Sequence, residues 1–314
     1  MFLEVIIVLL CWILNYKLFS DSFFHDIMLL IKKTGGKGMH NKIRLVIADI
    51  DSTLVDSKRN FTKKTKEILD CLHAHGVYLG IASGRPLDEL SKNAKKWGLQ
   101  YDFDFLIGMN GSEVWDNLHQ KEYSYFKLKK EWIKEIIDLM SSFESNYFIY
   151  HHGYLLCRKD DEMMHHSATS SDKEIVVMKD VEEMYAEENA KIMFRVKEEI
   201  MPEIEKYIEK HPSPYYKGFK TQTTLMEFAD RRVSKGFALQ KLCEMNNIAL
   251  EDVAAFGDTT NDNDMIAISG TGVCMCNGSD DTKAIADFIT EKSNDEDGLA
   301  YFIEEHYLKP YGWY

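Results

Sequence analysis

Four short polar segments carry the side chains that could do chemistry in this sequence. They are residues 49–53 (DIDST), 83–85 (SGR), 234–235 (SK) and 257–262 (GDTTND). Three of them follow apolar runs that are typical of buried strands, and Lys235 opens an expected helix. Carboxylates, a lysine and hydroxyl groups are together the side chains that can hold a metal ion and a phosphate group.

Each segment by itself also has a plain structural explanation. Two Asp residues after a strand often form only a turn and a helix cap, and Ser-Gly-Arg is common in loops. Lys235 could be a solvated helix residue, and Gly-Asp followed by Asn-Asp fits an Asx turn or a calcium-like loop. The combination favours a site, because ligands of open α/β sheets bind at the carboxyl ends of the strands, where all four segments are expected.

The elements that must position these segments alternate along the chain. Helices are expected at residues 62–75, from Pro86 to just before Gly98, and at 234–246. Strands that alternate with helices predict right-handed crossovers and a parallel sheet, so the predicted fold class is α/β. The apolar runs that predict buried strands are residues 43–50, 77–83, 103–109, 253–256 and 271–275.

Residues 117–224 interrupt this pattern. They are richer in Tyr, His, Lys and Glu, and the expected strands and helices no longer alternate, which predicts an inserted α+β module. The core domain would then consist of residues 39–116 and 225–314. Gly111 and the stretch near Thr224 are candidate hinges, since both lie at the predicted junctions.

The composition restricts the partners. The formal net charge is −13 at pH 7, so a polyanion such as nucleic acid is repelled, and a phosphorylated small molecule needs positive charge supplied locally at its site. The six cysteines are scattered and indicate no disulfide framework. A reducing compartment fits best, and we expect a cytoplasmic protein.

The first 38 residues differ from the rest. An apolar run at residues 5–14 is shorter than the roughly 20 residues that span a bilayer. Three interpretations are open: a weak membrane anchor through residues 5–19, an amphipathic extension, or translated sequence upstream of a start at Met39. The last is favoured, because the first expected strand follows Met39 closely and needs nothing before it.

In their order and context, the four segments resemble the motifs of the haloacid dehalogenase superfamily of phosphatases, in particular its Cof-like group of sugar-phosphatase relatives. The likeness extends over residues 43–307 and includes IGMNGSEV at 107–114 and DEDGLA at 295–300. It is weak in the inserted module. The resemblance implies a Rossmann-like core with an inserted α+β cap. Two positions depart from the pattern: Ser52, where the family usually has Gly, and Ser83, where many members have Thr.

The resemblance also implies the roles of the site residues. Asp49 would be the nucleophile that forms an aspartyl-phosphate, and Asp51 the general acid and base. Mg²⁺ would be held by Asp49, Asp258 and the backbone carbonyl of Asp51. The residues expected to contact the phosphate are Ser83, Gly84, Lys235 and Asn261, with Thr53 and Asp262 in support. For Arg85, a phosphate contact and a structural ion pair are equally open.

The predicted activity is therefore Mg²⁺-dependent hydrolysis of small phosphate monoesters, such as sugar phosphates. Two alternatives remain: a phosphomutase of the same superfamily, and a membrane-anchored module that binds phosphometabolites without catalysis. In the inserted module, His151, His152, Tyr154 and Arg158 are candidate substrate contacts, although solvated turn residues are the favoured interpretation. The pair His165 and His166 is expected in a polar loop.

Overall fold

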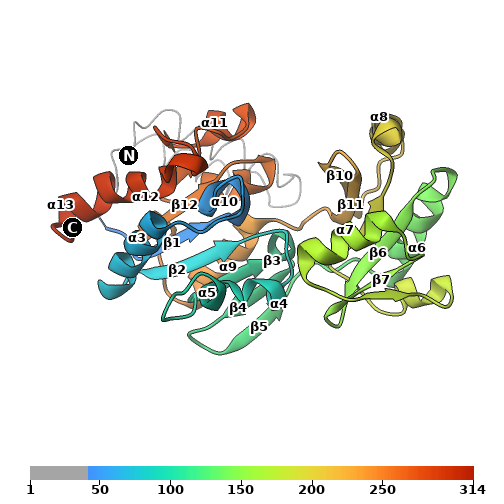
Figure 1. The fold of residues 1–314 in the computed structure, drawn as a ribbon, viewed down its shortest axis with the longest axis horizontal. Coiled ribbons are helices and arrows are strands. Elements are labelled where there is room, and N and C mark those ends of the chain that lie inside the picture. The colour runs from blue at the N-terminus through green and yellow to red at the C-terminus, as the bar shows by residue number, and fades with distance from the viewer. Residues whose placement is uncertain (1–41) are drawn as a thin grey trace, which may run out of the picture. The chain divides into compact units, whose positions relative to one another are not determined.

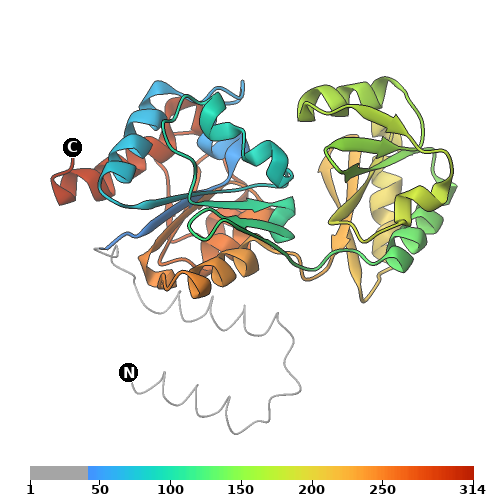
Figure 2. The same cartoon turned by 90° about the horizontal axis from the view of Figure 1, so that it is seen from below.

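The computed structural model describes residues 42–314 (Figures 1 and 2). The extension predicted at residues 1–38 and the candidate membrane segment 5–19 lie outside the described residues. Among residues 42–314, none of the helices is both long and apolar enough to cross a membrane.

The first sheet has eight strands in the order β14-β13-β12-β1-β2-β3-β4-β5. All pairs from β14 to β3 are parallel, whereas β4 and β5 add on as an antiparallel edge. This arrangement confirms the predicted α/β class. The bounds are β1 Leu45–Ala48, β2 Tyr78–Ala82, β3 Phe105–Gly108, β4 Glu113–Asp116, β5 Lys121–Ser124, β12 Val253–Gly257, β13 Thr271–Cys274 and β14 Phe288–Ile289.

Helices cover both faces of this sheet (Figure 1). Leu45 and Ile47 of β1 pack in one apolar cluster with residues of α9 (Lys235–Met245) and α10 (Asn263–Ile268). Val46 and Ala48, which alternate with them, lie near Leu69 of α3 (Lys63–Ala74) and Leu299 of α12 (Gly298–Ile303). Because both faces of β1 are buried, its sequence is continuously apolar. The remaining helices of this part are α4 Leu87–Leu90, α5 Asn93–Lys96, α11 Asp280–Ile285 and α13 Lys309–Tyr311.

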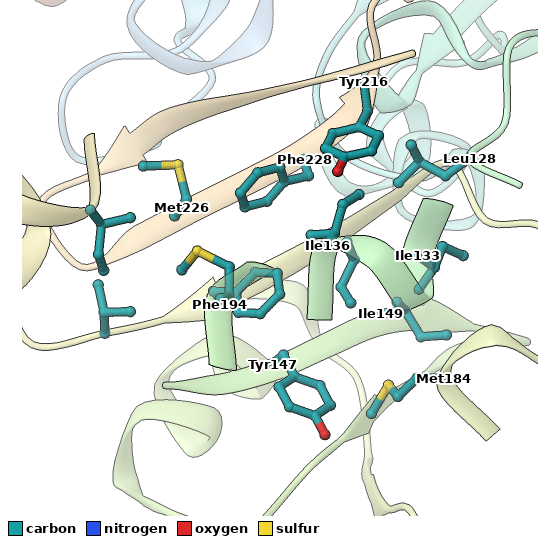
Figure 3. Packing of buried hydrophobic residues seen from close by; sticks show 14 of the residues in the cluster. Leu128, Ile133, Ile136, Tyr147, Ile149, Met184, Phe194, Tyr216, Met226 and Phe228 are labelled. Atoms are coloured by element: carbon teal, nitrogen blue, oxygen red, sulfur yellow. The ribbon is translucent and has the colours of Figure 1, made fainter. Parts of the chain in front are cut away.

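The second sheet has six strands in the order β10-β11-β9-β6-β7-β8, and only β7 and β8 pair in parallel. Helices α6 (Lys130–Leu139) and α8 (Met201–Lys210) pack on one face, where Ile133 and Ile136 meet Phe194 and Phe228 (Figure 3). Helix α7 (Glu162–Ser171) packs with the alternate residues of the strands. The bounds are β6 Asn146–His151, β7 Tyr154–Cys157, β8 Ile175–Val177, β9 Lys191–Arg195, β10 Tyr216–Gln222 and β11 Leu225–Asp230.

The structure shifts the boundaries predicted for the inserted module at residues 117 and 224. Strand β5 pairs with β4 in the first sheet, and β11 pairs with β9 and β10 in the second. The chain therefore crosses between the sheets after Ser124 and again after Asp230. A change in composition does not reveal this, since sheet membership depends on the hydrogen-bonding partner and not on the residues of one strand alone.

Two local expectations are wrong. His165 and His166 lie in helix α7, which begins at a cap where the Asp161 side chain accepts a hydrogen bond from the backbone N–H of Met164. Gly111 is not at a crossing between the sheets. It is buried between β3 and β4 with φ +106°, and a Cβ there would lie 2.2 Å from the carbonyl oxygen of Ser234. Its role is close packing against the start of α9.

This packing predicts that Gly111→Ala destabilises the fold by about 3 kcal/mol or more, because it combines a left-handed backbone with a clash against the main chain. Gly153→Ala is the matched control: Gly153 has φ +88° with open space around its Cβ, and should cost about 1–2 kcal/mol. Denaturant unfolding measures both. Equal losses would contradict the packing argument.

Candidate active site

Asp49 lies directly after the central strand β1. The N–H of Asp49 donates to the carbonyl of Phe256 in β12 at 2.9 Å, which fixes the backbone at the carboxyl edge of the sheet. The chain then turns through the helical segment Ile50–Leu54, in which Ser52 has φ +64°. Glycine adopts this left-handed region without strain. This explains why the family that the sequence resembles usually has Gly at the position of Ser52.

Lys235 is fully buried beneath Asp49. Its Nζ donates to Asp49 Oδ1 at 2.5 Å and to Asp262 Oδ1 at 2.6 Å. The position follows from the start of α9, where the Ser234 side chain accepts a hydrogen bond from the N–H of Phe237. Burial by itself would lower the pKa of Lys235, but the two carboxylates outweigh it and raise that pKa above its usual value. Lys235 is therefore a permanent cation.

Three buried carboxylates surround this cation. Asp258 follows β12 and accepts a hydrogen bond from Thr53 Oγ1 at 2.9 Å. Asp262 Oδ2 accepts from the backbone N–H groups of Asp258 and Thr259 at 3.0 and 3.1 Å, within a helix-capping turn. Burial and the neighbouring carboxylates raise the pKa of Asp258 to about 6, and burial raises the pKa of Asp49 well above its usual value despite Lys235.

This cluster fits a divalent cation. Carboxylate oxygens of Asp49, Asp258 and Asp262 lie within 4.8 Å of one another, and one lysine cannot balance three negative charges. All the donors are hard oxygens, which suit a cation of the magnesium or calcium type. Asp262, expected only as a supporting residue, contributes a carboxylate to the cluster. The side chain of Asp51 lies outside it.

Asp51 and Arg85 form a bidentate ion pair. Arg85 Nη2 lies 2.7 Å from Asp51 Oδ1, and Arg85 Nε lies 3.2 Å from Asp51 Oδ2. The Asp51 side chain is 45% exposed, so its carboxylate faces open space on one side. The sequence left open whether Arg85 contacts phosphate or forms a structural ion pair. In the structure Arg85 forms an ion pair, with Asp51.

The remaining polar groups come from two neighbouring loops. Ser83 is buried after β2, with its N–H bonded to Ile107 and its Oγ accepting from the N–H of Arg85 at 3.3 Å. Asn261 Nδ2 donates to Asn110 Oδ1 at 3.1 Å, and Asn110 has φ +57°. Asn110 lies in the segment 107–114, which resembles the family, but it was not among the site residues predicted from the sequence.

All of these loops border one cavity of about 340 Å³, which residues of the second sheet also line. The cavity therefore has a charged floor at the edge of the first sheet and a wall from the inserted module. Its lining from the first sheet is Asp49, Asp51, Ser52, Arg59, Ser83, Gly84, Arg85, Glu89, Asn110, Asp258, Thr259 and Asn261.

Comparison with known proteins identifies this arrangement. The family model of the haloacid dehalogenase-like hydrolases matches residues 46–303. The chain belongs to this family. A 5-amino-6-(5-phospho-D-ribitylamino)uracil phosphatase of Bacillus subtilis is 26% identical over 288 residues, which cover 86% of this chain and 99% of that protein. The predicted resemblance to the Cof-like phosphatase group is confirmed.

Solved structures of the family share the fold. A Thermotoga maritima protein is 26% identical with a TM-score of 0.74, covering 84% of this chain and 97% of its own. A haloacid dehalogenase-like hydrolase of Bacteroides thetaiotaomicron is 24% identical with the same TM-score, covering 84% of this chain and 99% of its own.

The inserted module of this hydrolase presents one face of its sheet to the cavity. Side chains alternate along a strand, so Lys191, Met193 and Arg195 of β9 share a face with Tyr150 and Glu227 of the neighbouring strands. All five line the cavity. None of the five was predicted from the sequence as a site residue. The alternation of charged and apolar residues in KIMFR is the signal that could have found Lys191 and Arg195.

The predicted substrate contacts of the module lie elsewhere. His151 and His152 both face Glu187, at 3.1 and 3.2 Å, and Tyr154 packs against the apolar cluster of the other sheet face. Arg158 donates to the carbonyl of Ser145. None of the four lines the cavity, so the structure does not bring them to the site. Of the four, His152 lies in the turn, whereas His151 ends β6 and Tyr154 begins β7, so the favoured interpretation as solvated turn residues is wrong for these two.

Lys191 connects the inserted module to the loop that follows β2. Its Nζ donates to Glu227 Oε2 at 2.9 Å and to the carbonyl of Gly84 at 3.0 Å. Lys191 and Glu227 are both buried, so removal of either one would leave an uncompensated charge beside the cavity. Glu89 of α4 is a third charged group here, and burial raises its pKa to about 7 although Lys173 and Arg85 oppose that shift.

The acidic cluster predicts a metal-linked stability. Without divalent metal and near neutral pH, Asp258→Asn should raise the free energy of unfolding by about 1–2 kcal/mol, since it removes one of three crowded charges. Adding Mg²⁺ should raise the thermal midpoint of the wild type and raise that of Asp258→Asn much less. Asp280→Asn, an exposed change on α11, serves as the control. A Mg²⁺ shift of the same size in all three proteins would exclude the cluster as the metal site.

The raised pKa of Glu89 predicts a pH dependence. A carboxyl whose folded pKa lies above its unfolded value contributes stability below the unfolded pKa and loses it as pH rises through the folded one. Between about pH 5 and about pH 8, the wild type should therefore lose on the order of 2 kcal/mol relative to Glu89→Gln. Urea unfolding across this range measures the difference, and parallel curves for the two proteins would contradict it.

Proposed function

We propose that this haloacid dehalogenase-type phosphatase hydrolyses small phosphate monoesters of metabolites with Mg²⁺, through an aspartyl-phosphate on Asp49. The observation that carries the proposal is the ion pair of Asp49, which lines the cavity, with the fully buried Lys235, beside Asp258 and Asp262. It combines a nucleophile with the positive charge that an anionic substrate needs.

Asp49 is assigned as the nucleophile. Its carboxylate would attack phosphorus opposite the leaving oxygen, so that an acyl phosphate forms and the phosphorus–oxygen ester bond breaks. A dianionic ester repels an anionic nucleophile, and Lys235 offsets this repulsion from a fixed, water-excluded position. A bound Mg²⁺, held by Asp49 and Asp258 with Asp262 beside them, would supply further positive charge to the phosphate oxygens.

Asp51 is assigned as the proton carrier. It would protonate the leaving oxygen and later accept a proton from the water that cleaves the aspartyl-phosphate. Asp51 lies two residues after Asp49 and lines the cavity, and its carboxylate is held by Arg85. Arg85 therefore acts as the residue that orients Asp51.

The groups assigned to the phosphate oxygens are hydrogen-bond donors at the cavity floor. They comprise the hydroxyl of Ser83, the N–H of Gly84 and the amide of Asn261, in addition to Lys235. Gly84 suits this role because Lys191 binds its carbonyl, which fixes the orientation of the peptide. The rest of the cavity would hold the leaving group.

The cavity wall favours polar leaving groups. Tyr150, Lys191, Arg195 and Glu227 all border it. Relatives in Bacillus subtilis are named as phosphatases of 5-amino-6-(5-phospho-D-ribitylamino)uracil, a polar compound with a ribityl chain. We propose sugar, polyol and ribityl phosphates as the substrate class.

Phosphate release from a panel of sugar phosphates, polyol phosphates, the ribitylaminouracil phosphate and an aryl phosphate tests the activity. We expect release with Mg²⁺, loss of it with EDTA, and a fall of at least about 10³-fold in Asp49→Asn. Acid-quenched Asp51→Asn should carry one phosphoryl group on the peptide that contains Asp49, because dephosphorylation lacks its base.

Asp88→Asn is the matched control, since it removes an exposed carboxylate outside the cavity and should keep wild-type rates. Conversion of a hexose phosphate to its isomer without free phosphate would support a phosphomutase instead. A folded wild type that releases phosphate from no compound on the panel would refute the proposal.

A further inference from the structure

Glu89 is a buried hydrogen-bond acceptor without a donor. Its side chain is 10% exposed, and Oε1 has no hydrogen-bond partner among the described residues. The nearest cation is Lys173, whose Nζ lies 4.0 Å from Oε1 and is bonded instead to Asp88. A buried acceptor that stays unpaired costs free energy, so such groups are rare unless something outside the chain pairs with them.

The unpaired oxygen belongs to a residue of the substrate cavity. Glu89 lines it together with Tyr150, Lys191 and Glu227 on the wall that the inserted module provides. Glu227 makes a useful comparison, because both of its oxygens are satisfied by the chain itself, one by Lys191 at 2.9 Å and the other by Thr221 at 3.1 Å. Of these two cavity glutamates, only Glu89 has an oxygen that is left without a hydrogen bond among the described residues.

The surrounding charges indicate what kind of donor fits. Lys173, Arg85 and Lys191 already act electrostatically on Glu89 and oppose the effect of burial on its pKa. Each of the three is paired with another carboxylate, Lys173 with Asp88, Arg85 with Asp51 and Lys191 with Glu227, and none of them makes a hydrogen bond to Oε1. A hydroxyl on the ligand can donate to the carboxylate of Glu89, and it restores the missing hydrogen bond without bringing another charge into this buried position.

We propose that Glu89 is a specificity residue that accepts a hydrogen bond from a hydroxyl group on the leaving group of the substrate. It selects phosphorylated polyols and sugars over phosphate esters whose leaving groups carry no hydroxyl. This inference rests on the proposed phosphatase function and adds to it a residue of α4, outside the four polar segments, that reads the part of the substrate remote from phosphorus.

The first test is a ratio of specificity constants. We compare kcat/KM for a polyol phosphate with kcat/KM for an aryl phosphate, which has no hydroxyl on its leaving group. In Glu89→Leu the ratio of polyol to aryl ester should fall at least about 10-fold, the usual effect of leaving a bound polar group unpaired. Glu89→Gln keeps an acceptor oxygen at the same place and should lose less.

The controls separate selection from folding and from net charge. Asp280→Asn removes one exposed negative charge outside the cavity and should keep the wild-type ratio. Glu89→Leu should not lower the thermal midpoint, because an unpaired buried acceptor does not stabilise the fold. A ratio that stays constant in Glu89→Leu, or that falls equally in Asp280→Asn, would overturn the role of Glu89.

Calorimetry makes the inference independent of turnover. The probes are the polyol phosphate and inorganic phosphate, and the proteins are Asp49→Asn and Asp49→Asn with Glu89→Leu. The second protein should bind the polyol phosphate at least about 10-fold more weakly, and the affinities for inorganic phosphate should differ much less. Equal affinities for the polyol phosphate would overturn the inference. Absence of phosphate release by the wild type would instead count against the phosphatase, and leave the calorimetric comparison to decide on Glu89.

Discussion

Lys235 lies between Asp49 and Asp262 with no exposure to solvent, and an ammonium group in that position is tolerated only if both partners are in place. Asp49 follows β1, Asp262 follows β12, and Lys235 begins α9. The ion triad therefore requires that β1 and β12 end, and α9 begins, at the same edge of the sheet. The close approach of Gly111 to Ser234 fixes the start of α9, so the geometry of the chemistry depends on a backbone contact that involves no charged group.

The same edge of the sheet has unfavourable backbone conformations. Ser52, Met109 and Asn110 all have positive φ, and Ser52 and Asn110 border the cavity. Non-glycine residues in this region carry strain that the surrounding structure must hold in place. Two hydrogen bonds hold these conformations here. The side chain of Asn277 donates to the carbonyl of Ser52, and the N–H of Asn110 donates to the carbonyl of Ser83. These bonds hold the two loops in the conformation that opens toward the cavity.

The inserted module follows a different constraint, which is the alternation of side chains in its sheet. One face must bury apolar residues against α6 and α8, and Figure 3 shows Phe194, Phe228 and Tyr147 in that cluster. The opposite face packs apolar residues against α7 and also carries the charged side chains that line the cavity. On β9, Lys191 and Arg195 line the cavity, whereas Phe194 points the other way into the apolar cluster. One strand therefore contributes to the core and to the cavity. A shift of one residue in register would reverse both faces.

Much of the catalytic part could be predicted from the sequence. Continuous apolar runs identified the buried strands, and Thr62 and Ser234 were recognised as helix caps. Three of the four polar segments follow strands of the first sheet and line the cavity, and the fourth begins α9, where Lys235 reaches Asp49. These features are local, because strand burial, capping and turn chemistry depend on residues a few positions apart. The α/β class followed from them, and the order of the polar segments carried the resemblance to the family.

Only the tertiary structure decided which groups meet across the chain. The sheet to which β5 and β11 belong depends on their strand partners. The ion pair of Arg85 with Asp51 joins residues 34 positions apart, and the cavity brings together Glu89, Lys191 and Glu227, up to 138 positions apart. The sequence therefore determined what kind of chemistry the edge of the first sheet holds. The packing of the second sheet decided what that chemistry can recognise, because the face of a strand that meets a cavity is set by long-range pairing and not by the strand's own residues.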